Sequence, residues 1–214
     1  ENLNYDGEAY NVAIGHNAGR QVTTGTKNTI LGGQAGDALT TGGENVAIGY
    51  LSLSAEDGHG GNVAVGNQTL EVQDAGADAY NTAVGYRAGK LVSTGVQNTL
   101  IGAFAGDALT TGQRNVAVGN YALSTEDTGS RSTAIGWYSL LMQNSDSLLY
   151  NTAVGYNSGG SITTGGQNTI IGSLCGDAIT SGNSNVAVGY QALTSETQGD
   201  RNVAIGNSAL EAQN

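Results

Sequence analysis

The chain has 214 residues, of which 35 are Gly and none is Pro, and its formal net charge is −11. Abundant Gly without Pro and without a Gly-X-Y period excludes collagen and is atypical of a disordered linker. Only 12% of the residues are charged and 6% aromatic, which excludes a large aromatic core and a heavily salt-bridged helical surface.

The seven Lys and Arg residues are scattered singly, so they form no basic patch of the kind that binds nucleic acid or an anionic membrane surface. The sequence contains no run of about 18 apolar residues and no secretory signal pattern, and we expect no membrane insertion. A single cysteine, Cys175, excludes an internal disulfide framework.

One five-residue signature, Asn-(Val/Thr)-Ala-(Ile/Val)-Gly, fills the chain from end to end. Its copies begin at positions 11, 28, 45, 62, 81, 98, 115, 132, 151, 168, 185 and 202. The spacings are 17, 17, 17 and 19 residues, repeated, so four units form a 70-residue super-repeat. Such self-similarity predicts a repeat architecture, here a single domain over 1–214 with super-repeats at 11–80, 81–150 and 151–214.

Within the first copy, Val12 and Ile14 are β-branched and flank Ala13, which is the period-2 alternation of a strand. The frequent Gly residues argue against a helix. The pattern predicts that the second and fourth residues of each unit fill the interior and that the third faces outward. The predicted fold is an all-β, parallel β-solenoid (β-roll) of twelve coils, with a length of roughly 60 Å at ~4.8 Å per coil.

Three later positions of each unit predict how the coils fill a shared core. The eighth residue is always small, which makes Cys175 a core filler rather than a nucleophile. Units one and two of each super-repeat have Gly at position nine and an aliphatic residue at position twelve, as in Gly36 with Leu39. Units three and four have Leu at position nine instead, as in Leu53, so every coil inserts one large apolar group.

Asn begins every unit except the one at Ser132, and stacking predicts a ladder of amides that hydrogen-bond along the rod. The predicted outward column at the third position is an apolar stripe, which we interpret as an inter-chain interface. Its members are Ala13, Ile30, Ala47, Ala83, Leu100, Ala117, Ala153, Ile170 and Ala187. Because one slender coil buries little surface, three chains packed around an axis are expected, as a homotrimer.

The Asn-Val-Ala-Ile-Gly and Asn-Thr-Ala-Val-Gly-Tyr units resemble repeats in the head domains of trimeric autotransporter adhesins. The Thr-Thr-Gly spacer is similar to repeats of phage tail-fibre proteins. The resemblance covers residues 11–210 and implies a left-handed, trimeric β-roll. The unit of 17 or 19 residues and the 70-residue period depart from the shorter adhesin unit.

Recurring acidic residues suggest calcium as one alternative ligand. Asp37, Asp107 and Asp177 share the 70-residue period, as do Glu56, Glu126 and Glu196. Members of one set lie four coils apart, too far to share an ion, and the Gly-Gly-x-Gly-x-Asp pattern of calcium β-rolls is missing. The two His residues, His16 and His59, sit at non-equivalent positions and indicate no catalytic group, so no enzyme activity and no cofactor are expected.

Aromatic residues suggest glycan contacts as another alternative. Tyr80 and Tyr150 recur at the two-residue insertion, and Trp137 and Tyr138 follow one strand. Exposed aromatic faces suit sugar rings, although Tyr at the insertion could also cover a wider corner. Ice binding by the recurrent Thr pairs is disfavoured because units three and four interrupt the array.

The sequence as a whole predicts a structural or adhesive fibre segment that attaches to a host surface through a glycan or protein receptor. We expect it in a virion tail fibre or on the extracellular cell surface. A monomeric glycan- or calcium-binding solenoid is the alternative. Residues 1–10 align with 71–80, so the chain is expected to be a piece of a longer array.

Overall fold

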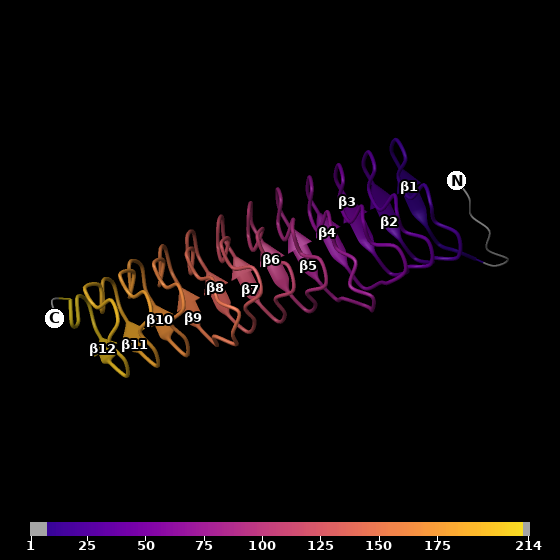
Figure 1. Cartoon of the computed structure of the whole chain (residues 1–214). Helices are drawn as coiled ribbons and strands as arrows, with labels where there is room; N and C mark the ends of the chain where they lie inside the picture. The colour runs from indigo at the N-terminus through magenta and orange to yellow at the C-terminus, as the bar shows by residue number, and fades with distance from the viewer. Residues whose placement is uncertain (1–7, 212–214) are drawn as a thin grey trace.

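The computed structural model describes residues 8–211, and residues 1–7 of the segment that aligns with 71–80 lie outside them. Twelve three-residue strands follow one another along a rod (Figure 1). They are β1 (Val12–Ile14), β2 (Thr29–Leu31), β3 (Val46–Ile48), β4 (Val63–Val65), β5 (Thr82–Val84), β6 (Thr99–Ile101), β7 (Val116–Val118), β8 (Thr133–Ile135), β9 (Thr152–Val154), β10 (Thr169–Ile171), β11 (Val186–Val188) and β12 (Val203–Ile205).

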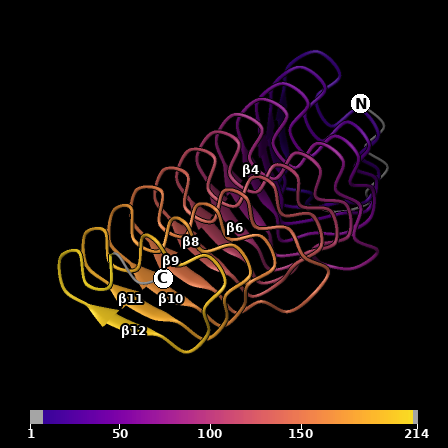
Figure 2. The same cartoon turned by 60° about the vertical axis from the view of Figure 1, so that its left-hand side comes forward.

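Each strand pairs in parallel with the next, and all twelve form one sheet in sequence order. The register places equivalent residues side by side, as in Ala47 beside Ala64. Eleven steps of ~4.8 Å give a stack about 53 Å long. The loops between strands return on one side of the sheet and stack as well (Figure 2). The predicted all-β parallel solenoid is therefore confirmed, and no helix within the described residues is long and apolar enough to cross a membrane.

The predicted direction of the strand side chains is wrong. The third residue of each unit, which is the middle residue of its strand, points into the coil: Ile30, Ala47, Leu100 and Ile170 are fully buried. The same holds for Ala83, Ala117, Ala153 and Ala187, while Ala13 at the first coil is partly buried. The nine residues proposed as an inter-chain interface are thus interior residues of one chain.

The third residue of each unit is usually Ala and is large once per super-repeat, because its size depends on the space that the position-nine residues leave in the core. Gly19 and Gly36 leave space at position nine of coils one and two. A Cβ on Gly19 would lie 2.9 Å from Cδ1 of Ile30, and a Cβ on Gly36 would lie 2.8 Å from Cδ1 of Leu39. Ile30 therefore fills the space that Gly36 leaves in its own coil and that Gly19 leaves in the preceding coil. In the coils with Leu at position nine, the third residue is Ala.

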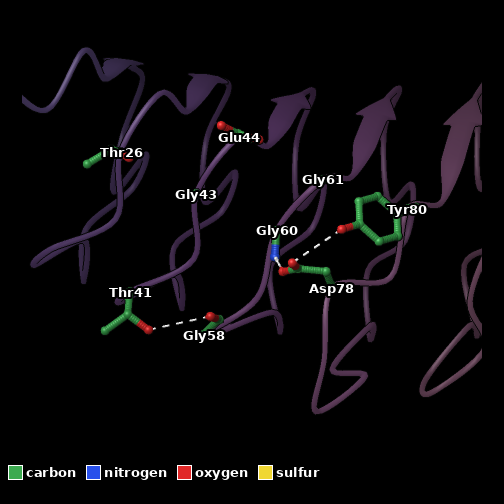
Figure 3. Close-up of a pocket in the computed structure, with 9 residues that line it drawn as sticks. All are labelled: Thr26, Thr41, Gly43, Glu44, Gly58, Gly60, Gly61, Asp78 and Tyr80. Atoms are coloured by element: carbon green, nitrogen blue, oxygen red, sulfur yellow. Dashed lines mark hydrogen bonds between the residues drawn. The ribbon is translucent and has the colours of Figure 1, made fainter.

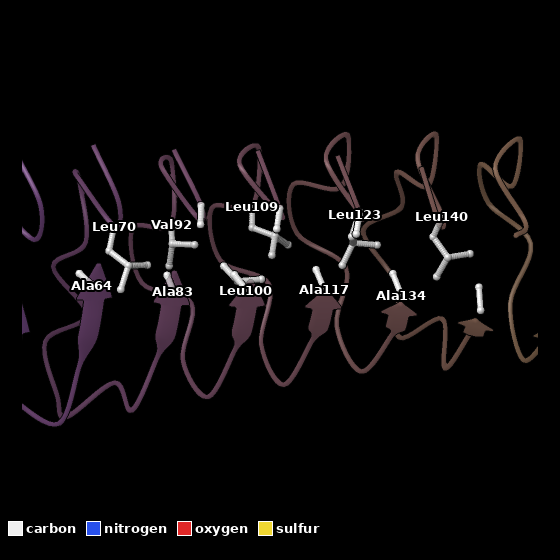
Figure 4. Close-up of a cluster of buried hydrophobic side chains, with 14 of the residues drawn as sticks. Ala64, Leu70, Ala83, Val92, Leu100, Leu109, Ala117, Leu123, Ala134 and Leu140 are labelled. Carbon is white, nitrogen blue, oxygen red and sulfur yellow. The ribbon is translucent and has the colours of Figure 1, made fainter. Parts of the chain in front are cut away.

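The predicted filling of the core at positions eight, nine and twelve is confirmed. Leu70, Leu109, Leu123 and Leu140 are fully buried and face the Ala or Leu of the neighbouring strands (Figure 4). The position-nine Leu residues adopt positive φ, 54° at Leu123, where other coils have Gly. The buried apolar contacts at these sites offset a left-handed conformation that costs about 1–2 kcal/mol.

A Gly residue follows each strand, and these residues form a column along the rod. Gly is needed there because the backbones of successive coils touch. Gly119 has a φ of 139°, and a Cβ at this position would collide with the carbonyl group of Gly136. Gly102 meets Gly119 in the same way. Only Gly allows both the positive φ and the close approach.

The Asn ladder predicted from the sequence is also present, and it is buried. The side-chain oxygen of Asn98 accepts a hydrogen bond from the backbone N–H of Asn115 (2.9 Å), and its side-chain amide donates to the carbonyl of Gly112 (2.9 Å). Each Asn of the ladder from Asn11 to Asn185 thus satisfies two backbone groups at the corner of the coil.

Asn98→Ala should lower the free energy of unfolding by about 1–3 kcal/mol for each backbone group that loses its partner, because both groups stay buried. Denaturant unfolding followed by circular dichroism measures the change. The exposed Asn67 offers a control, Asn67→Ala, which should unfold at the wild-type midpoint. Equal midpoints for all three proteins would contradict a stabilising ladder.

Burial raises the pKa of the Cys175 thiol to about 11. A thiol reagent should therefore leave the folded protein unmodified at neutral pH and react fully in denaturant. Because the thiol of the unfolded chain ionises at lower pH, near 9, stability should fall as pH rises from about 9 to 11. Cys175→Ala should remove that part of the alkaline loss, and an identical pH profile for the variant would refute the assignment.

Candidate functional site

Six aromatic side chains form a continuous cluster on the turn that follows strands β5 to β9. They occupy the sixth and seventh positions of five successive coils. We call this cluster the aromatic ladder, and it consists of Tyr86, Phe104, Tyr121, Trp137, Tyr138 and Tyr156.

The rings contact one another in sequence along the rod. Phe104 and Tyr121 stack with their centroids 4.7 Å apart and their planes at 8°. Tyr86 meets Phe104 edge to face at 5.2 Å, and Tyr138 lies 5.6 Å from Tyr121. Trp137 is 4.8 Å from Tyr138. Such pairs contribute roughly 0.5–1.5 kcal/mol each beyond their buried area.

Trp137 extends the cluster to the ninth coil through Tyr156, whose ring centroid is 5.5 Å away. Tyr86, Trp137 and Tyr156 are 44%, 50% and 44% exposed, whereas the position-seven rings beneath them are half-buried. The ladder therefore offers free ring surface at both ends.

The backbone after each strand sets the spacing of the ladder. The N–H of Phe104 donates to the carbonyl of Tyr86 (2.9 Å), and the N–H of Tyr121 donates to that of Ala103 (3.0 Å). Position seven has positive φ, 58° at Phe104 and 55° at Tyr121. These hydrogen bonds between successive coils place the Phe104 and Tyr121 rings one coil apart along the rod axis.

Positions six and seven of the five coils carry little charge. Arg87 is the one charged residue at positions six and seven of these coils, and its guanidinium lies 5.3 Å from the centre of the Tyr86 ring. Its Nε donates to the side-chain oxygen of Gln68 (3.1 Å). Asn120 and Asn157 supply amides on the same turn. Apolar ring surface and neutral hydrogen-bonding groups thus lie side by side.

The structure separates the four aromatic residues that the sequence singled out. Trp137 and Tyr138 belong to the ladder, whereas Tyr80 and Tyr150 lie on a different corner, directly before the Asn column. The Tyr150 hydroxyl accepts a hydrogen bond from Arg131 Nη1 (2.6 Å). Sequence reasoning missed Tyr86, Phe104, Tyr121 and Tyr156, which alignment of positions six and seven across the units would have grouped.

Tyr80 lines an open hollow of about 300 Å³ whose lining residues come from coils one to four (Figure 3). Its ring lies over Gly61, and its hydroxyl donates to the Asp78 carboxylate (3.4 Å). The other Asp78 oxygen accepts the N–H of Gly60 (2.9 Å). These contacts support the interpretation of Tyr80 as a corner cover.

The recurring acids cap corners. Glu126 is fully buried and accepts hydrogen bonds from the N–H of Gly129 (2.7 Å) and from Gln143 (3.0 Å). Glu56 makes the equivalent bonds and also contacts His59 Nδ1 at 3.2 Å, near Asp57 and Asp74.

The other recurring acids and the Thr pairs also have structural surroundings. Burial raises the pKa of the Asp37, Asp107 and Asp177 carboxyls. The Thr pairs bond between coils, as in Thr40 Oγ1 to the Asp57 carbonyl (2.9 Å).

The outer face of the sheet is formed by the second and fourth residues of the units, which are the first and third residues of the strands, and we call it the outer sheet face. Nine of its side chains are exposed by more than a third: Val12, Ile14, Leu31, Val84, Ile101, Ile135, Ile171, Val203 and Ile205. The strands contain only Val, Thr, Ala, Ile and Leu. An uncharged strip of aliphatic and Thr side chains therefore runs the length of an otherwise acidic molecule.

Comparisons of the chain with protein-family models, with curated proteins and with solved structures found no match.

Proposed function

We propose that this chain is a segment of a homotrimeric fibre, of a phage tail fibre or a cell-surface adhesin, that attaches to a host surface. The virion tail fibre or the extracellular cell surface would be its location. The observation that supports the proposal best is the outer sheet face on a straight stack of twelve coils. A stiff rod of this kind suits a spacer that carries receptor contacts.

The outer sheet face replaces the column of third residues as the proposed inter-chain surface. The strip of uncharged, largely aliphatic side chains is about 53 Å long, and exposed apolar side chains gathered on one face are typical of a protein interface. Its β-branched side chains stand in regular rows that can interdigitate with those of another sheet. Its lack of charge matters because the chain has a net charge of −11, and copies would repel one another elsewhere.

Three copies around one axis would bring all outer sheet faces together in equivalent positions, which is closed cyclic symmetry. The resemblance to trimeric adhesin heads favours this number. The role proposed is structural rather than catalytic, and it needs no cofactor. Two buried groups support a structural role. Glu126 accepts a hydrogen bond from a backbone N–H at a corner, and burial raises the pKa of the Cys175 thiol, which keeps it in its less reactive neutral form.

Light scattering on the purified chain should give three times its 21.5 kDa mass. The double variant Ile101→Asp, Ile135→Asp should be monomeric, because two carboxylates per chain would enter a shared apolar interface without partners. Circular dichroism should remain that of the wild type, since both side chains point out of the coil.

The matched control is Leu91→Asp, Leu148→Asp, which changes two exposed leucines outside the outer sheet face and should stay trimeric. A monomeric wild type at all concentrations would refute the assembly. A dimer would instead indicate two sheets packed face to face.

A further inference from the structure

We infer that the aromatic ladder is a binding platform for a neutral polysaccharide that lies along the rod axis. The inference deepens the proposed attachment function by naming the class of receptor, and it rests on that function for its biological role. Trp137 and Tyr138 were glycan candidates from the sequence, and the structure adds Tyr86, Phe104, Tyr121 and Tyr156 to them.

The backbone does not require these aromatic residues. Position seven has positive φ in every described coil, and in the first four coils it holds Asn17, Gln34, Leu51 and Gln68. Asn accommodates this conformation more readily than a bulky ring does. Position seven thus adopts this conformation without an aromatic residue in the first super-repeat, and a run of three rings at this position is confined to coils six to eight.

The direction of the ladder fits an extended ligand. Its rings span coils five to nine, four steps of ~4.8 Å or about 19 Å along the axis. At position six the side chain is large in coils five, eight and nine and small between them, at Ala103 and Asn120. A chain of several sugar rings could therefore contact Tyr86 at one end and Trp137 with Tyr156 at the other.

The chemistry of the ladder fits a neutral sugar. The C–H groups on one side of a pyranose form an apolar face that stacks on an aromatic ring, while its hydroxyls need donors and acceptors at the edge. Trp137 and Tyr156 provide exposed rings, and Asn120, Asn157 and Arg87 provide polar groups. A polyanion would meet one cation at the ladder and a strongly acidic chain around it.

The position of the single tryptophan gives a direct test in the unmodified protein, because all Trp fluorescence comes from the ladder. The probes are dextran, mannan, galactomannan, xyloglucan and arabinogalactan, with heparin as a polyanion and choline chloride as a cation. At least one neutral polysaccharide should shift the Trp137 emission to shorter wavelength and protect it from acrylamide quenching.

The double variant Tyr86→Ala, Tyr156→Ala keeps the fluorophore and should weaken that binding by about tenfold or more, because both ends of the platform lose an aromatic contact. The matched control is Tyr50→Ala, Tyr190→Ala. These residues occupy the same sixth position in coils three and eleven and are each 49% exposed, outside the ladder. The control should bind as the wild type does.

Four results would overturn the inference: no response to any neutral polysaccharide, a response to heparin alone, a response to choline alone, or equal binding by both double variants. The mass of the same samples separates this inference from the proposed assembly. A trimer without a polysaccharide response would contradict the platform alone, and a monomer with a full response would contradict the trimer alone.

Discussion

The close approach of successive coils is the constraint on which the rest of this structure depends. Gly119 touches the backbone of the next coil so tightly that no Cβ fits, and Gly102 touches Gly119 in turn. The twelve strands can pair in one continuous parallel sheet because this column allows each coil to lie directly on the last. Every column of side chains, buried or exposed, inherits that spacing.

A narrow interior follows from the short coil. Each layer has room for one or two large apolar groups, and the 70-residue super-repeat distributes them between coils. Ile30 and Leu39 fill the layers in which Gly19 and Gly36 leave space, whereas Leu53 fills the next. The polar corner is satisfied by Asn98 and its equivalents and by Glu126, so the buried backbone groups at the corners have partners although the chain has little regular structure.

The same periodicity gives the exposed columns their functional potential. Equivalent positions of successive units lie side by side along the rod, so similar residues at one position of several neighbouring units form a continuous surface. The outer sheet face is a column common to all twelve coils, which suits assembly along the whole rod. The aromatic ladder is confined to five coils, which suits a localised contact on a repetitive scaffold.

The sequence by itself determined the repeat, the strands, the parallel solenoid and the Asn column. It also determined how the core is filled, by Leu39 at position twelve where position nine is Gly36 and by Leu53 at position nine in the next coil. These features follow from spacing and residue size, which are visible in one dimension. It did not determine which face of a strand is inside. Alternation of large Val12 and small Ala13 predicted the large residue inward, but the narrow coil admits Ala and sends Val12 and Ile14 outward. The tertiary structure also decided that the rings of Phe104, Tyr121 and Tyr138 contact one another while Tyr80 stands apart, because contacts between coils depend on register and on the direction of each turn.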